Sequence, residues 1–146
     1  MLLTEWTLVR FLHVLGATLW VGGQLVLSGL VLPVLRARLG AEQRAPIGRE
    51  VGRRFGLFTL LVFLPVQVLT GLVLAAGDGV RWTHLGEDSY GRTLAAKLVL
   101  VAVVLLLSGL HGLAVARDRP VTGRVLAVAT LAGSVGIVLL ATALAG

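Results

Sequence analysis

The chain of 146 residues contains no cysteine and only one methionine, Met1. Disulfides, thiolate catalysis and cysteine-based metal sites are therefore excluded. Charged residues make up only 14% of the chain, whereas hydrophobic residues make up 57% and the mean hydropathy is +0.96. So little charge cannot cover the surface of a soluble domain of this size. The composition indicates an integral membrane protein.

Four continuous apolar segments are each near or above the roughly 20 residues that cross a bilayer as an α-helix. We expect spans at about residues 6–35, 55–76, 93–116 and 121–145, all within a single membrane domain that covers residues 1–146. The segments lack the alternation of transmembrane barrel strands, so helices are favoured. The predicted fold is all-α, a polytopic bundle of four transmembrane helices. Nineteen glycines favour close helix packing, and Pro65 should bend the second span.

A net charge of +6 can indicate a nucleic-acid-binding protein, but here the basic residues lie in short segments between the apolar spans. The predicted loop 36–54 holds six arginines, and the loop between the last two spans adds Arg117, Arg119 and Arg124. Retention of basic loops in the cytoplasm predicts that both termini face outward. The start of the chain has no basic region typical of a signal peptide, so we expect the first span to be retained.

From these features we expect a multi-pass protein of a bacterial-type plasma membrane. Its expected partner is the lipid bilayer and not nucleic acid. A homo-oligomer or a complex with other membrane redox subunits is also compatible with the sequence.

Ionisable residues inside the spans are functional candidates, because charge in hydrocarbon is costly. His13 and Trp20 share one helical face of the first span, and Lys97 and His111 share one face of the third. We expect these faces to meet inside the bundle, with His13 and Lys97 at similar depth. His111 lies 14 residues beyond Lys97, about 21 Å along the helix, so it cannot share a metal ion with His13. His84, in the outer loop, can fold over His13 to complete a metal site.

Each candidate also has a purely structural interpretation. Lys97 can extend its amine to the membrane interface, His111 can form a hydrogen bond there, and His84 can be solvated. Trp20 lies too deep for the aromatic belt, so it is core packing or the wall of a cofactor pocket. Further inward-facing polar positions are predicted at Thr59, Gln67, Thr70, Thr130 and Ser134.

Three segments resemble known membrane families. FLHVLGATLWVGG resembles the first helix of the CopD-type copper-resistance membrane domain, and RRFGLFTLLVFLPVQVLTGLVLA and YGRTLAAKLVLVAVVLLLSGLHG resemble its second and third helices. HemJ-type protoporphyrinogen oxidases are similar in the same places. That family uses a histidine of the first helix and a lysine of the third and binds haem b, which implies His13 and Lys97 here, with His111 at a later matching position. After Gly23 the chain departs from the HemJ pattern, because the Phe-Tyr-Leu-Pro-Arg run is absent.

Three functional hypotheses follow. Haem b is favoured, with His13 as a ligand and Lys97 as a second ligand or as a cation beside a propionate. Copper is the alternative cofactor, held on the outer side by His13, His84 and the N-terminal amine, although Cu(I) prefers the sulfur ligands that the chain lacks. The third hypothesis is a cofactor-free accessory subunit of a membrane complex. The sequence leaves open whether the protein is an enzyme such as a haem-dependent membrane oxidoreductase.

Overall fold

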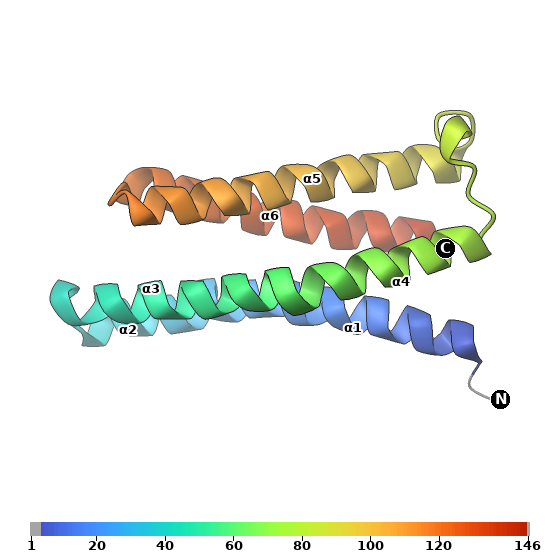
Figure 1. Ribbon diagram of the computed structural model, residues 1–146. Coiled ribbons are helices and arrows are strands. Elements are labelled where there is room, and N and C mark those ends of the chain that lie inside the picture. Colours follow the sequence, from blue (N-terminus) through green and yellow to red (C-terminus); the bar gives the residue numbers. More distant parts are fainter. Residues whose placement is uncertain (1–3, 146) are drawn as a thin grey trace. The chain divides into compact units, whose positions relative to one another are not determined.

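The computed structural model describes residues 4–145, which are almost entirely helical and include no strand. Four helical stretches are long and apolar enough to cross a membrane: Glu5–Arg38, Ala41–Gly77, Ser89–Ala116 and Pro120–Leu144. These findings confirm the predicted all-α class and the expectation of four helices long and apolar enough to cross a membrane. The chain divides after Gly79 into two compact units, and each unit is a helical hairpin (Figure 1).

The first hairpin has two long rods. The outgoing rod consists of α1 (Glu5–Val26), η1 (Leu27–Val31) and α2 (Leu32–Arg38), and the returning rod consists of α3 (Ala41–Phe58), η2 (Thr59–Phe63) and α4 (Leu64–Gly77). Only Leu39 and Gly40 separate the rods. The loop predicted at 36–54 is therefore wrong, because α3 extends the second span by some four turns on its N-terminal side.

Both rods contain a turn of π-helix directly before a proline. The Leu32 amide donates to the Leu27 carbonyl, and the Leu64 amide donates to the Thr59 carbonyl, each five residues back instead of four. Pro33 and Pro65 follow at once. A proline ring clashes with the carbonyl four residues earlier and cannot donate to it, so a widened turn accommodates the proline. The bend predicted at Pro65 thus coincides with a π turn that the sequence analysis did not foresee.

The second hairpin comprises a short 3₁₀ turn η3 (Trp82–His84), α5 (Ser89–Ala116) and α6 (Pro120–Ala145). Asp88 caps α5, since its side chain accepts a hydrogen bond from the Gly91 amide at 2.5 Å. Asp118, with a φ of 50°, turns the chain before Pro120 opens α6. Proline is well suited to the first turn of a helix, where its missing amide hydrogen has no helical partner. The third span begins at Ser89, earlier than the predicted residue 93, and the fourth agrees within one residue.

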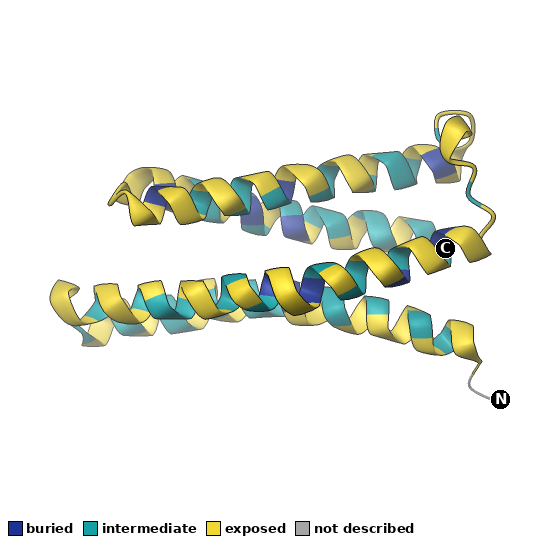
Figure 2. Cartoon of the chain, viewed as in Figure 1, coloured by how far each residue is buried: buried dark blue, intermediate teal, exposed yellow. Residues whose placement is uncertain are grey.

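Within each hairpin the buried residues form a narrow seam (Figure 2). The second hairpin shows why the seam can be so narrow: Val104 and Ser134 are fully buried, and a Cβ atom at Gly133 would lie only 2.4 Å from Val104 Cγ2. Glycine at this position lets α5 and α6 approach closely. Most other apolar side chains are exposed, as expected of helices whose outer faces meet lipid.

Candidate functional site

His13 is part of a polar cluster between α1 and α4. Its Nδ1 atom lies 2.8 Å from Thr70 Oγ1, and Thr70 Oγ1 in turn donates to the Val66 carbonyl at 2.5 Å. A hydroxyl has one proton, and at this separation the proton of Thr70 must lie between Oγ1 and the Val66 carbonyl oxygen. His13 Nδ1 is therefore the donor to Thr70. The proton of the neutral ring then lies on Nδ1, and Nε2 carries the lone pair.

Gln67 holds the backbone of the same residue. Its amide nitrogen Nε2 donates to the His13 carbonyl at 2.7 Å. Gly16 makes room for this contact, since a Cβ atom there would lie 2.5 Å from Gln67 Nε2. The ring itself lies against Gly71, where an added Cβ would approach His13 Cε1 to 3.3 Å. Small residues on both rods thus allow His13 to be oriented by two polar side chains.

Trp20 lies further along the same face of α1 and is only 4% exposed. Its ring stacks on Phe63 of η2, with centroids 4.5 Å apart and planes 11° from parallel. Its indole nitrogen donates to Thr59 Oγ1 at 3.2 Å, and that hydroxyl donates to the Phe55 carbonyl. Of the two interpretations offered for Trp20, the structure shows core packing. Its predicted contact with a cofactor stays a prediction.

The predicted inward positions of the second span are confirmed, because Thr59 and Thr70 are buried and Gln67 contacts α1. Phe63 was missed. The signal was present, since Phe63 lies four residues after Thr59 and seven before Thr70 and so shares their helical face. The positions predicted from the sequence were polar, and Phe63 is an aromatic residue in an apolar span, where it does not stand out.

His111 is held within the second hairpin. Its Nδ1 atom lies 2.8 Å from the Gly123 carbonyl of α6, and a carbonyl can only accept, so Nδ1 carries the proton. This contact fits the structural interpretation of His111. Thr130 and Ser134 of α6 are buried, as predicted, and Ser134 donates to the Thr130 carbonyl at 2.8 Å.

Lys97 is partly buried in the third turn of α5, which begins at Ser89. His13 is likewise in the third turn of α1, which begins at Glu5. Each side chain therefore lies about 12 Å from the start of its own helix. The predicted approach of Lys97 to His13 would join the two hairpins and stays a prediction.

His84 lies in the exposed turn η3 and pairs with Glu87 Oε1 at 2.5 Å. This contact fits a solvated loop histidine. The N-terminal amine, the third predicted copper ligand, lies outside the described residues. Among residues 4–145 no three histidine, aspartate or glutamate side chains are grouped so that they could hold a metal ion.

A protein of Aquifex aeolicus, described as uncharacterized, is 37% identical over 106 residues, which cover 73% of this chain and 67% of the relative. The chain belongs to the family of that protein. No family model matches the chain, and no solved structure matches it. The relationship therefore extends over most of the molecule but supplies no activity.

Proposed function

We propose that the two hairpins form a four-helix membrane bundle that binds haem b, with His13 as an axial ligand. The observation that carries this proposal is the chain of hydrogen bonds from His13 to Thr70 and on to Val66. It gives the imidazole a protonated Nδ1 and a lone pair on Nε2, the form in which histidine binds iron. A hydrogen bond to the second nitrogen of a ligand histidine also fixes the ring and raises its basicity.

Haem suits the donor set better than copper does. A porphyrin supplies four nitrogens of its own, so the protein needs only one or two axial ligands. A copper ion depends on several protein donors, and the described residues contain no such group. Copper held by His13 and His84 remains the alternative cofactor. The resemblance of the first and third spans to CopD-type and HemJ-type proteins supports a site that includes His13 in either case.

The protein's own residues would orient the group. Thr70 and Gln67 fix the ring and backbone of His13, and Gly71 provides space at the ring edge. When bound, haem supplies one-electron chemistry. We assign Lys97 to the haem propionates and not to the iron, because an amine about 12 Å below a helix end reaches the interface as a cation more cheaply than it loses a proton. His111 is given no ligand role.

We further propose that the protein lies in a bacterial-type plasma membrane with both termini outward. In the first hairpin the turn between α2 and α3 is flanked by the six arginines of residues 36–54, and in the second the turn between α5 and α6 is flanked by Arg117, Arg119 and Arg124. The opposite ends of the rods carry fewer basic residues, so the distribution supports cytoplasmic turns.

A cofactor-free accessory subunit is the second candidate, favoured by glycines that face no neighbour. An added Cβ would meet nothing within 4 Å at Gly22, Gly29, Gly109 and Gly112. Such small-residue faces are typical of transmembrane helices that dock against another helix.

The deciding experiment is an absorption spectrum of the detergent-purified protein, recorded with elemental analysis for iron and copper. We expect a haem b spectrum that is lost in His13→Ala and retained in His84→Ala. Lys97→Arg should keep the spectrum, since a guanidinium can pair with a propionate but cannot ligate iron, whereas Lys97→Ala should release haem more readily. Copper without iron would favour the alternative cofactor, and neither metal would favour the accessory subunit.

A further inference from the structure

In the first hairpin, the charged segment of the returning rod lies beside an apolar segment of the outgoing rod. Gly23 of α1 lies opposite Phe55 of α3, where an added Cβ would be 2.8 Å from Phe55 Cε2. From Phe55 toward the turn, α3 is rich in arginine, whereas from Gly23 toward the turn the other rod has no charged residue before Arg36. A basic helix therefore runs beside an apolar one for roughly 18 Å.

The apolar segment that follows Arg53 and Arg54 in the second rod is also exposed. Leu57, Leu60 and Leu61 share a helical face with Arg53 and have exposed fractions of 43%, 62% and 71%. Apolar surface of this kind is stabilised by acyl chains and not by water. Arg53 and Arg54, one turn before Leu57, then lie at the level of the lipid headgroups, where a long side chain can keep its charge in the polar layer.

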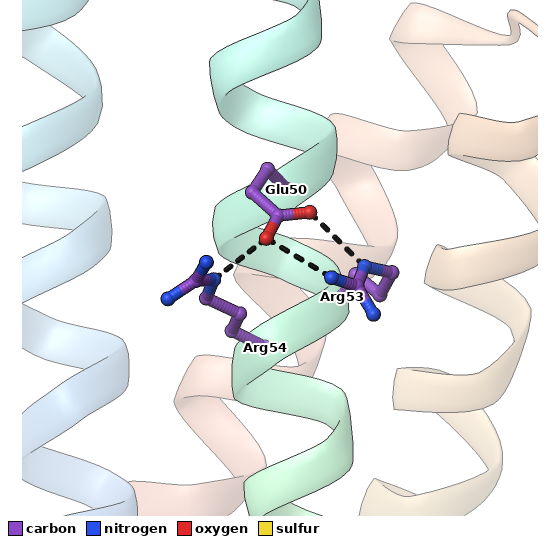
Figure 3. Close-up of polar contacts among 3 residues, drawn as sticks. All are labelled: Glu50, Arg53 and Arg54. Atoms are coloured by element: carbon purple, nitrogen blue, oxygen red, sulfur yellow. Dashed lines mark hydrogen bonds and ion pairs between the residues drawn. The ribbon is translucent and has the colours of Figure 1, made fainter.

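Two arginines next to the apolar span share one carboxylate (Figure 3). Glu50 Oε2 accepts from Arg53 Nε at 3.0 Å, Oε1 accepts from Arg53 Nη2 at 3.0 Å, and Oε1 also accepts from Arg54 Nε at 2.6 Å. Both arginine side chains remain exposed, at 63% and 76%. The three groups together carry one net positive charge.

Glu50 lies outside the apolar span that begins at Phe55, and it remains ionised. The hydrogen bonds from Arg53 and Arg54 lower the pKa of Glu50 to about 2. Any anion that binds the two guanidinium groups must therefore compete with a permanent carboxylate.

We propose that this part of the first hairpin binds an anionic phospholipid, with the phosphate between Arg53 and Arg54 and the acyl chains along the exposed side chains of Leu57, Leu60 and Leu61. Guanidinium groups bind phosphate with paired, charge-assisted hydrogen bonds. The Glu50 carboxylate accepts hydrogen bonds from the same guanidinium groups and therefore weakens phosphate binding. The inference rests on membrane insertion, but on neither the orientation nor a cofactor.

An acidic protein partner is the competing occupant. The lipid is favoured because Arg53 and Arg54 directly precede an exposed apolar face of the same helix, so an amphiphile matches the basic and the apolar surface at once. Basic clusters next to a transmembrane helix are the usual recognition feature for anionic lipid.

The test uses the full chain, purified and equilibrated with equal amounts of phosphatidylglycerol and phosphatidylcholine, with retained lipid measured by native mass spectrometry. We expect preferential retention of phosphatidylglycerol. The preference should fall about fivefold for each arginine removed in Arg53→Gln/Arg54→Gln. Arg81→Gln/Arg92→Gln removes the same charge at the other end of a different hairpin and should leave the preference unchanged.

A variant that is expected to bind more phosphatidylglycerol provides a control, because misfolding would lower the binding and not raise it. Glu50→Gln frees both guanidinium groups and should raise the preference for phosphatidylglycerol. Equal retention of the two lipids by the parent protein would overturn the proposal and leave an acidic protein as the better occupant. An equal fall in the two double variants, or no gain in Glu50→Gln, would also overturn it.

Discussion

Thr70 decides which form of His13 the hairpin contains. Its single hydroxyl proton is committed to the Val66 carbonyl, so its oxygen is left to accept from His13 Nδ1. A back-bonded threonine in a helix thus acts on a residue 57 positions away in sequence. The arrangement orients the ring whether the protein binds haem or not.

Substitution of Thr70 tests this role. Thr70→Val keeps the shape of the side chain but removes the acceptor, so the neutral His13 ring should lose its preference for the Nδ1 proton, and the hairpin should lose about 1 kcal/mol of stability. Thr70→Ser retains a hydroxyl and should behave as the parent. Nitrogen-15 NMR of labelled histidine reports the tautomer directly. An unchanged tautomer in Thr70→Val would remove Thr70 from this role.

At the scale of the helix, close approach matters more than apolar area. Lipid is as apolar as leucine, so two transmembrane helices associate mainly through packing contacts. In the second hairpin Gly133 receives Val104, and Gly136 lies against Leu100, where an added Cβ would be 3.1 Å from Cδ2. In the first hairpin Gly77 makes room for the ring of Trp6.

A matched pair of glycine substitutions separates packing from helix propensity. Gly133→Ala would place a methyl group 2.4 Å from Val104 Cγ2, and a buried β-branched side chain has little freedom to move away. We expect a loss of about 1–3 kcal/mol of stability. Gly109→Ala meets nothing within 4 Å and should be neutral or stabilising by up to about 1 kcal/mol. Unfolding in a denaturing detergent measures both, and Val104→Ala should partly rescue Gly133→Ala.

The ion pairs at the start of the second span predict a specific pH response. Because hydrogen bonds from Arg53 and Arg54 lower the pKa of Glu50 to about 2, the ion pairs are fully present above the pKa of the unfolded chain and are lost only as the pH falls through about 2. The gain in phosphatidylglycerol preference in Glu50→Gln, relative to the parent, should therefore be the same at pH 7 and pH 4.5. A gain that falls by about half at pH 4.5 would mean that the pKa of Glu50 is that of an ordinary glutamate.

At the scale of the whole molecule, the two hairpins and their basic turns predict one orientation. The chain has no native cysteine, so a single cysteine is a unique label. With both termini outward, Ser89→Cys in intact cells should react with an impermeant thiol reagent, and Gly40→Cys should react only after lysis. The reverse pattern would invert the topology and place His13 and Lys97 near the cytoplasmic leaflet.

The sequence alone determined the class of the protein and the number of spans, because continuous apolar segments of this length have one stable solution in a bilayer. It also placed Thr59, Gln67 and Thr70 on the inner face of the second span, since a helix puts residues three and four apart on one side. It failed at the segment 36–54, which was expected to be a loop because it is charged. Charge excludes a segment from hydrocarbon but does not stop it from being helical, and residues 41–54 form the charged N-terminal part of α3.

Only the tertiary structure decided which partners these residues have. That Thr70 accepts from His13 depends on the register of α1 against α4, and the close approaches at Gly16 and Gly71 are part of that register. The same holds for Trp20, whose partner Phe63 lies 43 positions away in sequence. Helical periodicity assigns residues to a face, but it contains no information about the rotation and offset of the neighbouring helix. Those are decided by how the side chains of the two helices fit together.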